Sequence, residues 1–494
     1  MHRSTLFGLL ILIGLTLPQT TFSQNIEKIS FDKKDSTDYY LAVRPASNHI
    51  QGTIVFLCSF RPPESMLPET RLHNVAFAND LLTVYVSMGK HLYADSTAVD
   101  RLNKVMINII QRFHADSSRV VLGGFEFGGT TALRYTEMAA GHPEQFPVHP
   151  KAVFAAASFT DLAGLYNYAD RWIKKNPPHA VGDGSIIMDM LNKELGSPAT
   201  SGPYQHFSPF SKDRDKGNEY ALRNLPVRLY YDTDIAWQLT AKGNSLLDTP
   251  VPDGSEMIRR LLAEGNQQAA FIASQQPGMR SNGVRSATSL SIIDEVDCVQ
   301  WIKAKLHIFD PTNPLAWEAP YQLTKPAGWT IARNLCPPPW APDFPLKGIE
   351  EICFAPGWGN AKADDYWSLL YLFWLDTGQS INATILQTNL KPYYDGLIAG
   401  NLGKADIETH KAATTVVVKQ TKTALNDSAT YKGTVGMLDY MALKPITLNF
   451  VIHVKDGEFN HHQAIIMELS PQPYGTGIWL QLNAISDGFA GQII

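Results

Sequence analysis

The chain has 494 residues, 44% of them hydrophobic and 18% charged, and a formal net charge of −5. This length exceeds what one hydrophobic core usually supports, so two or three domains are expected. The balanced composition excludes a disordered or fibrous protein, and the lack of a basic stripe argues against a nucleic-acid partner.

The N-terminus has the pattern of a secretory signal peptide. A short polar start precedes an apolar core from Leu6 to Leu17, and Thr21-Phe22-Ser23 places small residues before a cut at Gln24. The apolar core is shorter than a membrane span requires. We therefore predict a signal peptide over residues 1–23, export from a bacterial cytoplasm, and a periplasmic or extracellular mature protein without a membrane span.

Strand-like and helix-like segments alternate over residues 24–307. Continuous apolar runs predict buried strands at 53–58, 82–86, 119–123, 152–157, 227–231 and 270–273. From Val99 to Phe113, apolar residues recur every three or four positions, which indicates a helix that covers a sheet. Other helices are expected at 130–135, 186–195, 255–262 and 298–302. This alternation predicts an α/β fold with a mostly parallel sheet and helices on both faces.

The most specific motif is Gly124-Phe125-Glu126-Phe127-Gly128-Gly129. It lies between a predicted strand and a predicted helix, which is the context of a hydrolase nucleophile elbow. Glycines are needed on either side of an elbow because the central residue is strained and its neighbours pass close to one another. The central position holds Glu126 instead of a serine.

By this elbow, by the strands before it and by the segment from Leu225 to Trp301, residues 30–305 resemble the α/β-hydrolase superfamily. The resemblance implies a nucleophile at the elbow, an acid after a late strand and a histidine before the last helix. It also implies that the insertion at about 160–225 forms a cap. The matching positions hold Glu126, then Asp232 or Asp234, and then Thr288. The loop over residues 279–291 contains no histidine.

Two functions follow from these positions. The first is a binding or scaffold protein with a degenerate catalytic set, whose ligand is a small molecule, a peptide or a glycan. The second is an esterase, a peptidase or an epoxide-hydrolase-like enzyme in which Glu126 forms an ester. Hydrolysis of that ester needs a base, and a threonine hydroxyl such as that of Thr288 takes up no proton near neutral pH. We therefore favour the first function.

The second function also allows a displaced serine. Ser59 and Ser158 each follow a predicted strand, a position that is also typical of turn residues. Histidines elsewhere in this part of the chain include His91, His179 and His206, which reach an elbow only through an unusual cap placement.

Prolines crowd residues 308–347, which predicts a linker without regular structure. Beyond it, residues 348–494 predict a smaller antiparallel α+β domain with no apparent family resemblance. We expect strands at 366–375, 381–388, 414–418, 446–454 and 463–469 and a helix at 389–399. Asp376-Thr377-Gly378 and Asp456-Gly457 are typical of hairpin turns.

The four cysteines allow two interpretations. Cys336 and Cys353 form a disulfide around the proline-rich segment if the compartment is oxidising. Alternatively, these two together with Cys58 and Cys298 are small buried residues.

No metal or cofactor is predicted. No C-x-x-C or His/Cys spacing indicates zinc. His453, His461 and His462 flank a predicted hairpin tip, where polar residues serve solvation. The aromatic residues that crowd the C-terminal part are most simply explained as core.

Overall fold

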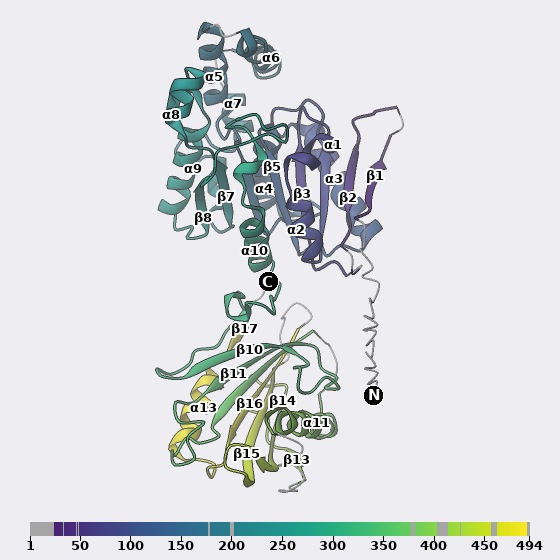
Figure 1. Ribbon diagram of the computed structural model, residues 1–494, viewed down its shortest axis with the longest axis vertical. Coiled ribbons are helices and arrows are strands. Elements are labelled where there is room, and N and C mark those ends of the chain that lie inside the picture. The colour runs from purple at the N-terminus through teal and green to yellow at the C-terminus, as the bar shows by residue number, and fades with distance from the viewer. Residues whose placement is uncertain are drawn as a thin grey trace, which may run out of the picture. The chain divides into compact units, whose positions relative to one another are not determined.

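The computed structural model describes residues 24–32, 34–45, 47, 49–175, 178–197, 202–376, 381–402, 413–424, 426–455 and 462–491. The chain divides into two compact units, one ending at Ile302 and the other beginning at Lys303 (Figure 1). The predicted signal peptide lies outside the described residues. Within these ranges, no helix combines the length and apolarity needed to cross a membrane.

The N-terminal unit contains one eight-stranded sheet. Its strands are β1 Ile26–Ser30, β2 Tyr39–Val43, β3 Gly52–Cys58, β4 Leu81–Ser87, β5 Val120–Phe125, β6 Ala152–Ala156, β7 Val227–Tyr231 and β8 Ala269–Ala273. They are ordered β1-β2-β4-β3-β5-β6-β7-β8. β2 is antiparallel to both of its neighbours, and β4, β3 and β5 to β8 are mutually parallel. The predicted mostly parallel sheet is confirmed.

Helices cover both faces of this sheet. The helices of this unit are α1 Pro63–Met66, α2 Leu72–Ala78, α3 Ser96–Phe113, α4 Phe127–Gly141, α5 Leu162–Lys175, α6 Pro178–Leu195, α7 Gly202–Phe207, α8 Ile235–Trp237, α9 Val251–Ala263 and α10 Glu295–Lys305. On β4, Val84 packs in the same core cluster as α3, whereas the next residue, Tyr85, contacts His73 of α2. Successive side chains of a strand point to opposite faces, so α3 and α2 lie on different sides.

The C-terminal unit is an antiparallel sheet with helices on its faces (Figure 1). Its strands are β9 Tyr321–Gln322, β10 Thr330–Cys336, β11 Gly348–Phe354, β12 Leu369–Leu375, β13 Thr415–Gln420, β14 Ala429–Asp439, β15 Lys444–Lys455, β16 Gln463–Ser470 and β17 Ala490–Gly491, and its helices are α11 Ala383–Asn401 and α13 Gly477–Asp487. Seven strands form the order β10-β11-β12-β16-β15-β14-β13, and β17 pairs with β9. The predicted smaller α+β domain is confirmed.

The two long helices of this unit cover opposite faces of the sheet. Tyr371 of β12 belongs to the same core cluster as α11. Its neighbour Leu372 belongs to the cluster that contains Trp479 of α13. The aromatic side chains of this part therefore build core on both sides of one sheet.

The strand predicted at 381–388 is wrong, because residues from Ala383 onward belong to α11. The side chain of Asn382 accepts a hydrogen bond of 3.0 Å from the Ile385 amide and caps the helix. Leu386 and Leu390 are buried at a spacing of four residues, so the helical period prevails over the alternating pattern. Thr377 and Gly378 of the predicted turn lie outside the described part of the chain.

The prediction that residues 308–347 lack regular structure is also wrong, because β10 lies among them. No proline occurs between Pro326 and Pro337, so every residue of Thr330–Cys336 keeps a backbone N–H for the ladder. β10 pairs with β11 in a register that runs from Thr330↔Phe354 to Cys336↔Gly348.

The disulfide interpretation is wrong, because all four cysteines are free and buried. Cys336 packs in the core cluster on the α11 face of the sheet, whereas Cys353 packs on the α13 face. Cys353 pairs with Ile331, five residues away from Cys336 along β10. A disulfide cannot span this separation through the sheet.

The pairing of β15 with β16 agrees with the predicted second hairpin. Lys455 lies opposite Ala464 in an antiparallel register. The Asp456-Gly457 turn and His461 lie outside the described residues. His453 is held inside the unit by Asp427, whose Oδ2 lies 2.8 Å from its Nδ1, and by Glu468 at 3.5 Å.

Candidate functional site

The turn after the central strand β5 holds Glu126 in a strained conformation. Glu126 follows β5, precedes α4, and has φ 50° and ψ −121°. Its N–H donates to the Ala156 carbonyl at 2.9 Å, and its own carbonyl accepts from the amides of Gly129 and Thr130 at 3.1 and 3.2 Å. These bonds hold a backbone conformation that a non-glycine residue rarely adopts. Glu126 therefore lies at the carboxyl end of a central strand.

The three glycines of the motif are required by close backbone packing. A Cβ on Gly124 would lie 2.3 Å from the carbonyl carbon of Gly128, and one on Gly128 would lie 2.1 Å from the carbonyl oxygen of Leu57. A Cβ on Gly129 would lie 2.0 Å from the Ser158 hydroxyl oxygen. The turn, β3 and α4 thus approach more closely than any side chain permits.

The Glu126 carboxyl group lies in a partly buried, positively charged environment. Burial raises its pKa above the usual value, and a nearby negative charge on Asp183 acts in the same direction. The positive charges of Arg61 and Arg280 and a hydrogen bond from the Thr288 side chain oppose this increase. Burial has the largest effect, so Glu126 holds a proton more readily than an ordinary glutamate.

Thr288 connects Glu126 to one of these arginines. Arg280 Nη2 donates to Thr288 Oγ1 at 3.3 Å, and the Ser286 hydroxyl lies at the same distance from that oxygen. The structure therefore brings Glu126 and Thr288 together. A threonine hydroxyl at this point can donate a hydrogen bond but cannot serve as a base near neutral pH.

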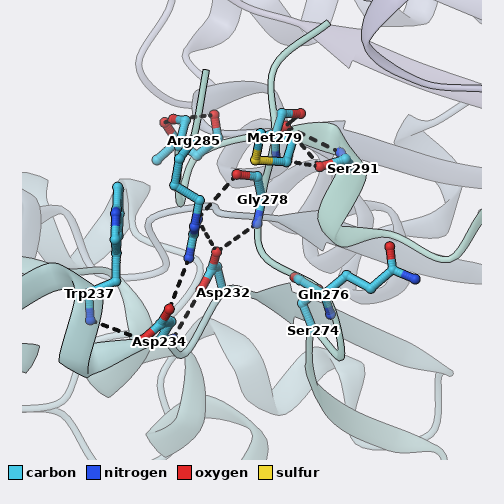
Figure 2. Close-up of polar contacts among 12 residues, drawn as sticks. Asp232, Asp234, Trp237, Ser274, Gln276, Gly278, Met279, Arg285 and Ser291 are labelled. Atoms are coloured by element: carbon cyan, nitrogen blue, oxygen red, sulfur yellow. Dashed lines mark hydrogen bonds and ion pairs between the residues drawn. The ribbon is translucent and has the colours of Figure 1, made fainter. Parts of the chain in front are cut away.

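The acid position is occupied by an ion pair. Figure 2 shows Arg285 between Trp237 and Gly278, with its guanidinium group directed at Asp232 and Asp234. Arg285 Nη1 lies 2.6 Å from Asp232 Oδ2, and Nη2 lies 3.5 Å from Asp234 Oδ2. The guanidinium also donates to the Gly278 carbonyl at 3.2 Å and lies 4.1 Å from the Trp237 ring centroid.

Asp232 is held as a carboxylate in this pair. Burial favours its neutral form, but hydrogen bonds from Arg285 and from the amides of Gly278 and Asp234 lower its pKa below the usual value. Asp234 has a structural role as well, since it caps α8 by accepting from the Trp237 amide at 3.0 Å. The carboxylate at the acid position thus bonds to an arginine.

A cavity of about 180 Å³ lies beside this group. Its walls include Tyr168 and Trp172 of α5, Trp237 of α8, and the side chains of Asp232 and Thr288. Aromatic walls with a few converging polar groups are typical of small-molecule sites. Thr288 belongs both to this cavity and to the surroundings of Glu126, so the cavity adjoins the elbow.

No protein-family model and no curated protein matches the chain. Among solved structures, it is similar to carboxyl esterase 2 from the mycorrhizal fungus Tuber melanosporum, at 14% identity over 59% of this chain and 88% of that one, with a TM-score of 0.39. An esterase from Rhizomucor miehei matches at 14% identity over 57% and 85%, with a TM-score of 0.38. The Pyrococcus horikoshii acylaminoacyl peptidase matches at 14% identity over 59% of this chain and 43% of that one, with a TM-score of 0.37.

Strand order and elbow geometry decide the fold of the first unit. Only β2 runs against the other strands of the eight-stranded sheet, and the sharp turn after β5 leads directly into α4. The N-terminal unit has the α/β-hydrolase fold.

In the α/β-hydrolase unit, ion pairs connect α5, which provides one wall of the cavity, to the segment before α9. Asp248 has a fully buried side chain and accepts from Arg171 Nε of α5 at 2.8 Å. Lys175, one turn further along α5, also pairs with it. The Ser245 amide donates to the same carboxylate at 2.7 Å. These bonds fix α5 over the site.

Replacing Asp248 by asparagine is expected to lower the unfolding temperature at pH 7 by about 4 °C. Arg171 and Lys175 hold the pKa of Asp248 well below its usual range, against about 3.9 in the unfolded chain. The contribution of the Asp248 carboxylate to the free energy of unfolding is therefore complete above about pH 4 and is lost as the pH falls further. Thermal unfolding of both proteins between pH 7 and pH 3 should show the difference shrinking at the acid end. A difference that grows towards low pH would contradict this assignment.

The serines and histidines considered for a displaced mechanism have other surroundings. Ser158 is buried and donates to the Ala156 carbonyl at 3.0 Å. Ser59 is buried too, and its hydroxyl has no hydrogen-bond partner among the described residues. His91 pairs with Asp95, and His206 packs edge-on against the Phe207 ring. The side chain of His179 lies outside the described residues.

Three arginines at this site were not singled out from the sequence. Arg61 lies in the loop after β3, and Arg280 and Arg285 lie in the loop after β8. The available signal was their position in loops at the carboxyl ends of parallel strands, where α/β proteins bind ligands. The superfamily pattern used for the sequence prediction assigns no role to a positive charge at these positions.

Proposed function

We propose that the α/β-hydrolase unit binds a ligand at the elbow without hydrolysing it. The observation that supports this most directly is the 2.6 Å pair of Asp232 with Arg285. In a hydrolytic triad, the acid orients and stabilises the imidazole that moves the proton. Here that acid is already bound to a guanidinium, and Thr288 replaces the imidazole.

The chemistry of Glu126 points in the same direction. If its carboxylate attacked a substrate, the resulting ester would persist until a base activated water. Its neighbours Arg61, Arg280 and Thr288 do not accept a proton near neutral pH. The raised pKa of Glu126 further reduces the fraction of nucleophilic carboxylate.

The cavity suits a small molecule or the end of a peptide or glycan. Its volume of about 180 Å³ and its aromatic walls fit a group about the size of one ring. In our proposal, the predicted signal peptide directs this site to the outside of the cytoplasm. The protein would then act as a periplasmic or extracellular binding or scaffold protein.

The alternative is a hydrolase that uses Glu126 as its nucleophile. Its support is the elbow itself, whose strained backbone at φ 50° and ψ −121° presents the Glu126 side chain as a nucleophile would be presented.

A substrate panel separates the two functions. Ester, amide and epoxide substrates given to the purified mature chain are expected to turn over no faster than in buffer. Glu126→Gln should leave those background rates unchanged, because no step depends on the carboxylate. Turnover that Glu126→Gln abolishes would establish the hydrolase and reject the binding function. Labelling of Ser59 or Ser158 by a serine-directed activity probe would establish a hydrolase with a displaced serine and would also reject the binding function.

A further inference from the structure

We propose that the ligand of the elbow site carries an oxyanion group, such as a carboxylate, phosphate or sulfate, which pairs with Arg61 and Arg280. This inference rests on the proposed binding function and names the chemistry of its ligand.

The first support is the charge at the site. Arg61 and Arg280 are close enough for each to act on the charge of Glu126, and Arg61 also disfavours the charged form of Arg280. Within the described residues, neither arginine forms an ion pair within 4 Å, whereas the neighbouring Arg285 pairs with Asp232 at 2.6 Å. Both arginines act on the partly buried Glu126 carboxyl group, and Glu69 also acts on Arg280. Since Arg61 and Arg280 repel one another, an additional anion would relieve their repulsion.

The second support is that two different loops bring the arginines to the elbow. The Arg280 guanidinium lies 5.7 Å from the ring centroid of Phe125, the residue before Glu126. Phe60, the residue before Arg61, packs against Phe127, the residue after Glu126, with ring centroids 5.2 Å apart. The loops after β3 and β8 thus each bring one arginine to the elbow.

The third support is the helix that starts at the elbow. α4 has 15 residues and begins at Phe127. The amides of Gly129 and Thr130 are used by the Glu126 carbonyl, while those of Phe127 and Gly128 precede the first intrahelical bonds. The positive end of the helix dipole therefore adds to the field of the two arginines.

Glu126 sets the pH dependence of this site. As a carboxylate it repels a bound oxyanion, whereas in its protonated form it can donate a hydrogen bond to one. The groups that act on it are Arg61 after β3, Arg280 and Thr288 after β8 and Asp183 of α6, and its own charge raises the pKa of Tyr168 of α5. Oxyanion binding should therefore strengthen as the pH falls through the raised pKa of Glu126.

Calorimetric titration of the mature chain with four probes tests the proposal: acetate, benzoate, phosphate and sulfate, all at constant ionic strength. At least one is expected to bind saturably, and benzamide, the neutral counterpart of benzoate, should not bind. Arg61→Gln and Arg280→Gln should each weaken binding by about tenfold, which corresponds to the loss of one charge-assisted contact. Glu126→Gln should tighten binding severalfold and remove its pH dependence.

Arg259→Gln is the matched control, since Arg259 pairs with Glu256 on the exposed surface of α9. It should bind the probes as the wild type does. Saturable binding that survives both Arg61→Gln and Arg280→Gln, or no saturable binding by any probe, would overturn the oxyanion site. If the site is confirmed, the probe that binds most tightly identifies the class of oxyanion. A flat substrate panel with no anion binding rejects this inference alone, whereas turnover lost in Glu126→Gln rejects the binding function itself.

Discussion

Gly128→Ala is expected to destabilise the α/β-hydrolase unit by at least about 3 kcal/mol. The added methyl carbon would lie 2.1 Å from the Leu57 carbonyl oxygen, which is a backbone atom of β3. Leu57 pairs with Val86 of β4 and with Gly124 of β5, so it cannot move without distorting the centre of the sheet. The loss is a large part of the about 5–15 kcal/mol that stabilises a typical domain.

Urea denaturation followed by circular dichroism measures this loss. Gly141→Ala is the control, because Gly141 ends the same helix and a Cβ there meets nothing within 4 Å. It should change the free energy of unfolding by no more than about 0.5 kcal/mol. Equal unfolding midpoints for Gly128→Ala and Gly141→Ala would show that α4 does not lie so close to β3.

Glu351→Ala is expected to destabilise the C-terminal unit by about 3–5 kcal/mol. Glu351 is almost completely buried on β11, its Oε2 lies 2.5 Å from Arg333 Nε, and it accepts from the Tyr321 hydroxyl at 3.0 Å. Only 18% of the Arg333 side chain is exposed, so removing the carboxylate leaves a largely buried cation without its partner. The large effect comes from this unpaired charge more than from the strength of the pair.

The measurement is the unfolding transition of the C-terminal unit, followed by its tryptophan fluorescence, because a chain of two units need not unfold in one step. Asp395→Ala removes the exposed pair of Asp395 with Lys391 on α11 and should cost less than about 0.5 kcal/mol. The double variant Glu351→Leu with Arg333→Met should recover most of the loss, since neither charge then remains. If it is no more stable than Glu351→Ala, the unpaired charge is not the cause.

Strong local patterns made much of the fold predictable. The spacing of Leu102, Val105 and Ile109 predicts α3, whose buried residues include all three. β14 was missed because Gly433 and Gly436 weaken its strand pattern. The structure explains the first of these glycines, since a Cβ on Gly433 would lie 1.8 Å from the Val417 carbonyl oxygen of the neighbouring strand. That contact depends on strand pairing, which the local sequence does not record.

The site was predictable only where a motif describes it. The elbow placed Glu126, and the superfamily pattern placed Asp232 and Thr288. The arginines could not be assigned, because Arg61 and Arg280 come from loops far apart in the sequence and meet only once the sheet has formed. Likewise, nothing in the order of residues shows that Asp232 is bound by Arg285.

The Asp232–Arg285 pair also restricts how a serine–histidine–aspartate triad could be built into this chain. Installing a serine at Glu126 and a histidine at Thr288 would place the new imidazole near an aspartate that an arginine already neutralises. Removing Arg285 first would leave Asp232, whose side chain is only 4% exposed, as an uncompensated buried charge. Every order of these three changes therefore passes through an inactive or a less stable protein. The ion pair therefore opposes conversion of this site into a triad by single substitutions.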